Sequence, residues 1–299
     1  MKKYHWYWLL ACLLCSSMLS CQKVMIDDPT EENGDGSRVV VRLNVDRLEM
    51  LPFAGAKSTR ATDVKAVCSR LNLAVYQNGE RIEQVNQESS SDTYGQLKVV
   101  LAPGQYTVAV IAHSGAKNAV MTNPEKITFD GKVTDTFYYY GELTVRGDTS
   151  QDLTLQRAVA MFRLKITDKV PENVSRMHFF YTGGSSTFDA VHGVGCVKSQ
   201  QGELRDVVAD MYEHGGVFEV YTFPRADSKV LSVTVKALDA GNNLLVEKQF
   251  PEVAVKRNMI TQYQGSFFGG PPSGNNAKED SICINWDSPD EWEQLDKSF

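Results

Sequence analysis

The sequence predicts an all-β protein made of two tandem β-sandwich domains. Short runs in which apolar and polar residues alternate recur along most of the chain, and this period of two is typical of half-buried strands. Turn motifs rich in Gly, Asn and Pro separate the runs. Only residues 62–70 and 205–213 have a helical pattern, and both are short. Short strands with regular turns favour sandwiches over helical folds.

Length and composition agree with a globular protein of two domains. The chain has 299 residues, of which 42% are hydrophobic and 10% aromatic, so disorder throughout is excluded. Without Lys2 and Lys3 the 31 basic residues fall to 29 against 37 acidic ones, a net charge of −8. This balance argues against a nucleic-acid partner and against electrostatic adhesion to anionic lipid. Attachment to a membrane would need a lipid chain.

The first 20 residues have the layout of a secretory signal peptide. Lys2 and Lys3 precede the apolar run 4–14, and Ser20 stands directly before Cys21. In bacteria such a cysteine resembles the site of a lipoprotein signal, where the thiol is acylated. The apolar run is shorter than the roughly 18 residues of a membrane-spanning helix, and cleavage at Cys12 would leave almost no apolar core. We therefore predict that residues 1–20 are removed and that Cys21 carries a lipid such as palmitate.

Residues 21–37 are predicted to be a flexible tether. They are polar, acidic and without periodicity, so they cannot bury enough apolar surface to become ordered. The acidic residues from Asp27 to Asp35 lack the ordered spacing of a calcium loop. The tether would link a lipid to a folded body.

Residues 38–157 are predicted to form the first sandwich domain. Val39 and every second residue to Val45 are expected to share a buried face. The Asn78-Gly79 pair predicts a hairpin, and 102–104 predict a second turn. The predicted strands are 39–45, 71–75, 95–101, 105–113, 137–145 and 152–156.

Residues 158–268 are predicted to form the second sandwich domain, after a break at 146–150 or just past the strand that follows. A turn at 240–243 separates two of its strands. Residues 269–299 then form a Gly/Pro-rich linker and a strand-like extension at 281–286. A single strand is not stable alone, so it must pair with this protein's sheet or with another molecule's. The predicted strands of this domain are 158–167, 177–182, 217–223, 230–238 and 244–250.

A search for groups of catalytic or metal-binding residues favours structural roles for the residues over functional ones. The histidines are scattered and do not have zinc-ligand spacing. His192 and Cys196 suggest a Cys/His enzyme only by proximity, with no evident third group. Gly183-Gly184 lacks the Lys of a phosphate loop, so a turn is expected there. We therefore expect no enzyme activity, no cofactor and no metal.

The cysteines after Cys21 are Cys68, Cys196 and Cys283, an odd number at wide spacings. One disulfide between Cys68 and Cys196 is conceivable, but isolated buried thiols are the favoured interpretation. Tyr138-Tyr139-Tyr140 could stack on carbohydrate. In a strand, however, the middle ring faces opposite to the outer two, so at least one ring belongs to the core.

Five stretches of the chain resemble segments of Bacteroidales fimbrial subunits. Those in the first half are LNLAVYQNGER at 71–81 and LAPGQYTV at 101–108. Those in the second half are LQRAVAMFRLKI at 155–166, VPENV at 170–174 and RNMITQYQGSFF at 257–268. Together with the lipoprotein signal, they are most similar to the FimB-type anchor or accessory branch of the fimbrillin superfamily.

This resemblance implies two transthyretin-like Greek-key sandwiches, lipid attachment to the outer membrane and assembly with other fimbrial subunits at the cell surface. In stalk subunits of the family, a protease cuts after Arg and removes the first strand, and the open groove accepts a strand from the next subunit. Arg60, between Thr59 and Ala61, matches such a cleavage site; it equally fits an ordinary exposed Arg in a loop. An anchor subunit can stay uncut.

The extension at 281–286 is then a candidate donor strand, because Ile282, Ile284 and Trp286 share one face of it. The sequence thus predicts a lipid-anchored, non-enzymatic fimbrial subunit that anchors, caps or joins a surface polymer by strand exchange. The alternative is a surface glycan-binding lipoprotein, and a host protein or glycan is a candidate additional partner.

Overall fold

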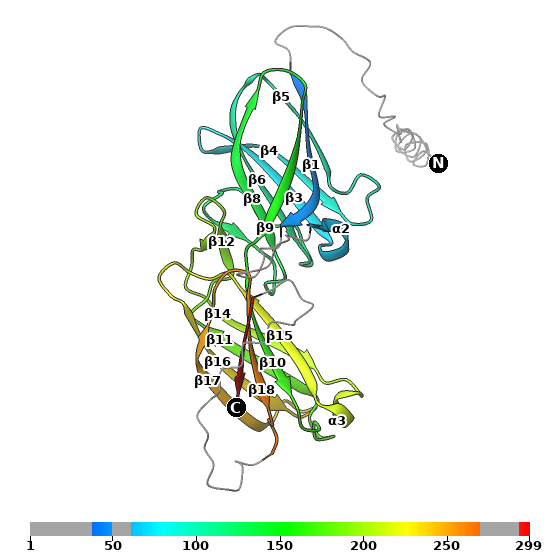
Figure 1. The fold of residues 1–299 in the computed structure, drawn as a ribbon, viewed down its shortest axis with the longest axis vertical. Helices are drawn as coiled ribbons and strands as arrows, with labels where there is room; N and C mark the ends of the chain where they lie inside the picture. The colour runs from blue at the N-terminus through cyan, green and yellow to red at the C-terminus, as the bar shows by residue number, and fades with distance from the viewer. Residues whose placement is uncertain (1–37, 50–60, 270–292) are drawn as a thin grey trace, which may run out of the picture. The chain divides into compact units, whose positions relative to one another are not determined.

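The computed structural model describes residues 38–49, 61–269 and 293–299, which belong to one compact unit spanning 38–299. Figure 1 shows that strands dominate this part of the chain. Its helices are single turns, α2 (Val64–Val67) and α3 (Met211–His214). The predicted all-β class is confirmed. Cys21, Arg60 and the segment 281–286 lie outside the described residues.

The two predicted helices are largely wrong. Asp63 caps α2 by accepting the Lys65 N–H at 2.8 Å, but the chain is already extended at Cys68. Residues 205 and 206 belong to a strand instead, because pairing with a neighbouring strand outweighs a weak local helical preference. Only the last part of the second segment is helical, as α3.

One sheet contains eight strands from the first half of the chain, in the order β2-β1-β9-β8-β6-β3-β4, with β5 also pairing β1. The β8 and β9 strands pair at only two positions, Phe137 with Arg157 and Tyr138 with Gln156, so the sheet turns into a second layer there. The strands are β1 (Val39–Glu49), β2 (Ala61–Asp63), β3 (Arg70–Gln77), β4 (Glu80–Glu88), β5 (Gln96–Leu101), β6 (Gly104–His113), β8 (Phe137–Val145) and β9 (Thr149–Arg157).

Alternate residues of both layers form the first hydrophobic core. Val41, Leu43 and Val45 of β1 are fully buried, as the period of two predicted. The hairpin between β3 and β4 is also confirmed: Asn78 and Gly79 have φ of 52° and 83°, which suits a tight antiparallel turn. The turn at 102–104, in contrast, joins strands that do not pair with each other, since β5 pairs β1 while β6 pairs β3 and β8.

Two four-stranded sheets from the second half of the chain enclose a second core. Their orders are β15-β10-β18-β19 and β14-β11-β16-β17, and buried residues of both sheets meet in one cluster. Phe162 and Phe179 face each other across this core at 6.5 Å between ring centroids. The strands are β10 (Ala160–Ile166), β11 (Arg176–Thr182), β14 (Gln200–Asp206), β15 (Gly216–Thr222), β16 (Val230–Leu238), β17 (Leu244–Ala254), β18 (Met259–Gly265) and β19 (Glu293–Ser298).

A third core gathers residues from both halves. A small sheet of β7 (Ile127–Thr128), β12 (Thr187–Asp189) and β13 (Val194–Gly195) covers it, and β7 pairs β12 across the halves. Tyr138 and Tyr140 pack against this core, whereas Tyr139 packs against the first, so the predicted alternation of the three rings is confirmed. The predicted boundary after residue 157 falls between β9 and β10, and the division into two domains stays a prediction.

An ion pair also links the two halves. The Arg157 guanidinium donates to both carboxylate oxygens of Asp135, at 2.9 and 3.0 Å, and to Asn258 Oδ1 at 2.8 Å. It lies 4.7 Å above the Phe137 ring. Burial raises the pKa of Asp135, and the adjacent guanidinium opposes this effect. Arg157 therefore holds the end of β9 to the segment that precedes β18.

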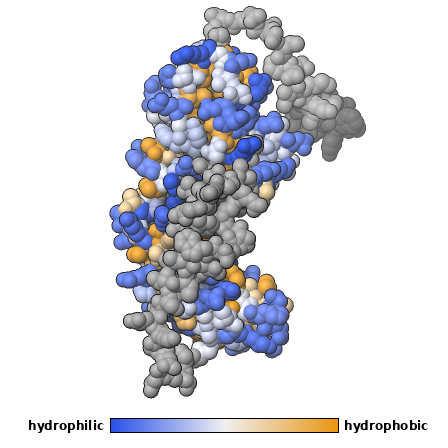
Figure 2. Space-filling model, in the orientation of Figure 1, coloured by the Kyte–Doolittle hydropathy of each residue, from blue (hydrophilic) through white to orange (hydrophobic). Residues whose placement is uncertain are grey.

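Hydrophilic residues cover most of the described surface that Figure 2 shows, and only small hydrophobic patches interrupt them. The exposed large hydrophobic side chains are scattered over separate strands, including Ile82 on β4, Leu204 on β14 and Leu244 on β17. Scattered residues of this kind are normal for a protein surface.

Candidate functional site

The C-terminal strand β19 extends a sheet edge after a long gap in the described chain. It runs parallel to β18, with six residue pairs from Met259 opposite Glu293 to Gln264 opposite Ser298. A parallel neighbour needs a crossover connection of a dozen or more residues, and residues 270–292 provide the length. In the order of this sheet, β18 is the strand next to β19 among the described residues.

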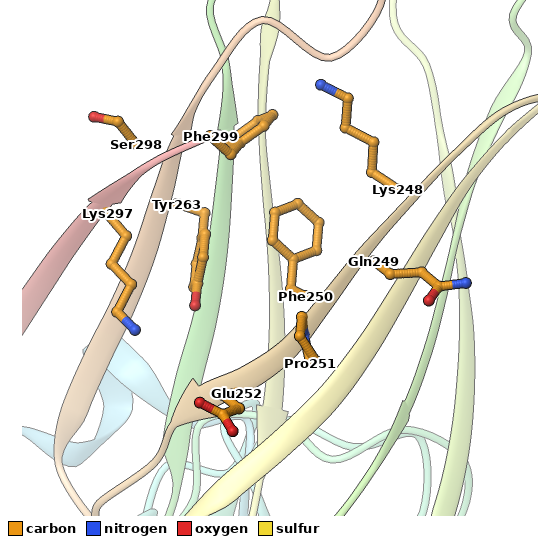
Figure 3. Close-up of a pocket in the computed structure, with 9 residues that line it drawn as sticks. All are labelled: Lys248, Gln249, Phe250, Pro251, Glu252, Tyr263, Lys297, Ser298 and Phe299. Atoms are coloured by element: carbon orange, nitrogen blue, oxygen red, sulfur yellow. The ribbon is translucent and has the colours of Figure 1, made fainter. Parts of the chain in front are cut away.

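A pocket of about 490 Å³ lies where β17, β18 and β19 meet, and we call it the C-terminal pocket. Figure 3 shows the rings of Phe250, Tyr263 and Phe299 gathered in it, with lysines at its rim. The centroid of the Phe250 ring is 4.9 Å from that of Tyr263 and 5.3 Å from that of Phe299. Phe299 thus fixes the end of β19 by aromatic packing.

Two lysines add cation–π contacts to this packing. Lys248 Nζ lies 4.8 Å from the centroid of the Phe299 ring, and Lys297 Nζ lies 5.5 Å from that of Tyr263. Lys248 Nζ also donates to the Ser266 carbonyl at 2.6 Å. Burial lowers the pKa of Lys248, and the charge of Asp168 opposes this effect.

Asp168 fixes the point at which the chain leaves β18. Its carboxylate accepts N–H bonds from Phe267, Phe268 and Gly269 at 2.7–2.9 Å and the Ser266 hydroxyl at 2.9 Å. Burial alone would raise the pKa of Asp168, but these hydrogen bonds outweigh it and hold the pKa below its usual value. The position of residue 269 is therefore set independently of where β19 binds.

His192, which the sequence pairs with Cys196 only by proximity, has an orienting group that the sequence did not reveal. Asp189 Oδ2 lies 2.7 Å from His192 Nδ1, and its other oxygen accepts the His192 backbone N–H at 3.0 Å. The bond from Asp189, with its charge, raises the pKa of His192. Burial and the charge of Asp189 also raise the pKa of the Cys196 thiol, which disfavours the thiolate that a nucleophile needs.

The conceivable disulfide is absent among the described residues, where Cys68 and Cys196 are both free. Cys68 is buried, as expected of an isolated thiol, and burial raises its pKa. Cys196 is exposed, so the expectation of a buried thiol is wrong there. It comes directly after the two-residue strand β13. Cys283 lies outside the described residues.

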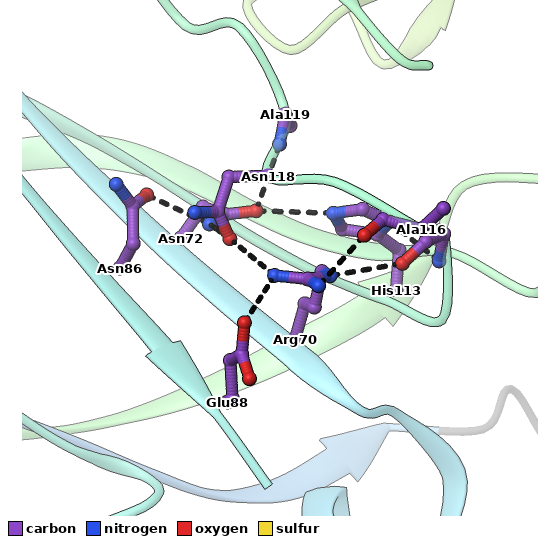
Figure 4. Close-up of polar contacts among 9 residues, drawn as sticks. Arg70, Asn72, Asn86, Glu88, His113, Ala116, Asn118 and Ala119 are labelled. Carbon is purple, nitrogen blue, oxygen red and sulfur yellow. Dashed lines mark hydrogen bonds and ion pairs between the residues drawn. The ribbon is translucent and has the colours of Figure 1, made fainter. Parts of the chain in front are cut away.

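Hydrogen bonds join Arg70, Asn72 and His113 in a largely buried polar cluster of the first sandwich (Figure 4). The Gly115 N–H donates to His113 Nδ1 at 3.0 Å, so the proton sits on Nε2, which lies 3.1 Å from Asn72 Oδ1. Arg70 donates to the carbonyls of Gly115 and Ala116. Burial, aided by the charge of Arg70, lowers the pKa of His113 to about 4. The cluster holds the loop after β6 in place.

Two other kinds of site are not found in the part of the chain that the structure describes. Acidic, histidine and cysteine side chains do not gather there in a group able to hold a metal ion. Likewise, among residues 38–49, 61–269 and 293–299, no helix has the length and apolarity to cross a membrane.

Comparison with known families assigns the chain to one of them. Residues 33–297 match DUF6562, a family of unknown function. The chain belongs to the DUF6562 family. No curated protein matches it. The match includes all strands described above except the last residue of β19, so the C-terminal strand is part of the family's common region.

Several solved structures are similar to this DUF6562 protein in architecture. The fimbrial anchor protein Mfa2 from Porphyromonas gingivalis is 9% identical, over 71% of this chain and 82% of that one, with a TM-score of 0.40. The tip fimbrial protein Mfa3 from the same organism is 11% identical, over 76% and 94%, with a TM-score of 0.38. A candidate cell adhesion protein from Bacteroides eggerthii is 10% identical, over 90% and 99%, with a TM-score of 0.44.

Fimbrial proteins are thus among the structures that this chain is similar to, as the resemblance in the sequence led us to expect. The FimB-type assignment, the lipid on Cys21 and cleavage at Arg60 stay predictions. The aromatic residues of the C-terminal pocket were missed, because Phe250, Tyr263 and Phe299 are far apart in the sequence. Their signal was weak, since each is only a single aromatic residue within a strand or directly after one.

Proposed function

We propose that this protein is a non-enzymatic, lipid-anchored subunit of a cell-surface fimbria, and that it joins neighbouring subunits by strand exchange. The single observation that supports exchange best is β19, a strand that completes a sheet edge from beyond a 23-residue segment, 270–292. The stretches that resemble fimbrial subunits and the lipoprotein signal at Cys21 support the same function from the sequence.

The chemistry of β19 suits a strand that can be replaced by the same strand of another copy. Main-chain hydrogen bonds to β18 provide affinity for any extended chain, and side-chain contacts then select the register. The contacts of Phe299 and Lys297 lie at the end of the strand and provide that selection. A 23-residue connection can reach at most about 80 Å, so it can serve an edge on the same molecule or on its neighbour.

The N-terminal end of the chain would attach the protein to the membrane. A lipidated Cys21 precedes the acidic stretch 22–37, and the folded body begins with β1 at Val39. An acyl chain contributes roughly 0.8 kcal/mol for each buried CH₂, so several chains on one cysteine hold a protein firmly in a membrane. An attached body with an exchangeable strand can anchor, join or end a polymer at the outer membrane.

Disulfide trapping tests strand exchange. Gln264 and Ser298 are exposed and opposite each other in the β18–β19 register, and residues so placed can be bridged. We expect a Gln264→Cys chain and a Ser298→Cys chain, expressed together, to form a linked dimer on oxidation. All variants carry Cys196→Ser and Cys283→Ser to remove background thiols. The readout is the dimer band on non-reducing gels.

Two controls make this result decisive. A chain with both cysteines should form an internal bridge, which verifies the register, and a Gln264→Cys chain paired with Lys98→Cys on the distant strand β5 should give only background dimer. If the double variant bridges internally while the mixed single variants stay at background, β19 does not exchange and the proposal is wrong.

The anchor is tested separately by Cys21→Ser in a bacterial host that processes lipoproteins. We expect the wild-type protein in the membrane fraction and the variant in the soluble fraction, because the thiol is the acylation site. A Cys196→Ser variant is the matched control and should stay with the membrane. Equal membrane retention of Cys21→Ser would contradict lipid attachment.

A further inference from the structure

A second pocket, of about 630 Å³, lies on the first sheet, far in sequence from β19, and we call it the polar pocket. It is formed on the face of β3, β6 and β8 that points away from the first core; these three strands lie side by side (Figure 1). Because Tyr106 and Val108 of β6 face that core, Gln105 and Thr107 face the pocket.

The strand register places the lining side chains in rows. Thr107 is opposite Tyr76 on one side and Glu142 on the other, and Gln105 is opposite Thr144. Tyr140 lies two residues before Glu142 on β8, on the same face of the strand, and is half-buried. The turn with Asn78 forms one wall. Most of the lining therefore belongs to inner strands of the sheet, and Asn78, Gly79 and Pro124 add residues from turns.

The polar groups of this pocket are both donors and acceptors, and several lack a partner among the described residues. Thr144 donates to Gln105 Oε1 at 2.8 Å, which orients the amide so that its NH₂ group is available to the pocket. Among the described residues, Glu142 has no ion-pair partner. The hydroxyls of Tyr76 and Tyr106 are already bonded to the carbonyls of Met121 and Ala102, so they are not available to a ligand.

This set of groups discriminates between classes of ligand. Of the residues that line the pocket, none is a cation and one is a carboxylate, so anions such as phosphate are disfavoured. One carboxylate is too few oxygen ligands for a bound metal ion. Amide, hydroxyl and carboxylate groups beside a half-buried aromatic ring instead match vicinal hydroxyls and the C–H face of a sugar ring.

We infer that the polar pocket binds a neutral saccharide. The inference is independent of strand exchange, since it uses β3, β6 and β8 and not the C-terminal strand. It gives a location to the glycan-binding alternative, which the sequence could connect only with the three consecutive tyrosines. Of these, Tyr140 alone lines the pocket. A subunit with such a site would hold a saccharide while it is assembled.

The test uses the full chain in detergent micelles and four probes: maltohexaose, cellohexaose, mannohexaose and N-acetylchitohexaose. Isothermal titration calorimetry should give a dissociation constant of about 10⁻⁴ to 10⁻³ M for at least one of them, the range of a small open polar site. We expect Gln105→Leu and Tyr140→Ala each to weaken that binding at least tenfold.

Lys98→Ala, an exposed change on β5, is the matched control and should leave the affinity within twofold. Tyr140 also packs on the third core, so its variant can lose stability; Gln105 is exposed, and its variant should keep the thermal midpoint of the wild type. Absence of binding to all four probes, or binding that survives Gln105→Leu within twofold, overturns the inference. Neither result bears on the dimer trapped through β19.

Discussion

The position of the proton on the His113 ring determines which hydrogen bonds this side chain makes. Because Nδ1 accepts the Gly115 N–H, the ring must donate from Nε2, and Asn72 Oδ1 is placed to accept. Adding a second proton would break the bond to Gly115 and put a charge in a buried site beside Arg70. The folded protein therefore contains neutral His113 at neutral pH.

This arrangement predicts an acid-sensitive stability. The pKa of His113 is about 4 in the folded state and about 6.5 in an unfolded chain. Between these values the unfolded chain binds more protons, so the free energy of unfolding falls as the pH drops from about 6.5 to about 4, by up to about 3 kcal/mol in total. His113→Gln should flatten the pH dependence by up to about 1.4 kcal/mol per pH unit.

Urea unfolding of both proteins between pH 4 and pH 7 measures the two slopes. Losing the ring contacts changes the stability of the variant by an amount that does not depend on pH, so only the slopes are compared. Equal slopes would mean that His113 does not titrate as the buried geometry requires.

For single residues, the sequence predicted the burial that follows from local alternation and missed a hydrogen bond that depends on turn geometry. Val41 and Leu43 were assigned to the core correctly, because a strand fixes which side each residue faces. The bond between Asp189 and His192 depends on a turn geometry that no periodicity encodes. The bare alternation of three tyrosines, in contrast, was enough to place Tyr139 opposite the other two.

At the scale of elements, strands and turns were more predictable than their pairings. The Asn-Gly turn was found from two residues, because a hairpin of this type needs positive φ at both. The parallel pairs β1–β9 and β10–β18 were not foreseen, since they join strands about 100 residues apart. The strand predicted at 281–286 lies outside the described residues and stays a prediction, whereas the strand at Glu293–Ser298 was not foreseen.

The hairpin gives a clean test of backbone conformation. Gly79 has φ of 83°, and no atom lies within 4 Å of the position that an added methyl group would take, so Gly79→Ala adds conformational strain without a clash. We expect a loss of about 1 kcal/mol in the free energy of unfolding. Gly147 has equally open surroundings but no positive φ, so Gly147→Ala should change stability by less than about 0.5 kcal/mol. Equal effects in urea unfolding would contradict this account.

At the scale of the whole molecule, the two series of strands share a core as well as an ion pair. The sequence suggested a break near residues 146–150 or just after the next strand, and β9 does lead directly to β10. It did not suggest that residues such as Ala109 and Ile260 would be buried in one cluster. Contacts between halves depend on how two finished sheets meet, which local patterns do not describe.

Removing the link at Arg157 should therefore weaken the whole fold. Arg157→Met leaves the Asp135 carboxylate and Asn258 without their partner, and we expect a loss of about 3 kcal/mol or more. Lys117→Met removes an exposed ion pair with Asp130 and should cost less than about 1 kcal/mol. Urea unfolding followed by circular dichroism compares them. A loss at Arg157 no larger than at Lys117 would show that the link carries no stability.

The parallel direction of β19 also has a mechanical consequence. Its six paired residues lie alongside β18, so tension applied along β19 stretches the bonds between the strands together, in shear. Peeling the strand away from one end would instead break these bonds one after another and needs less force. A junction made by this strand would resist a steady pull along the polymer and still allow the strand to be replaced when no load acts on it.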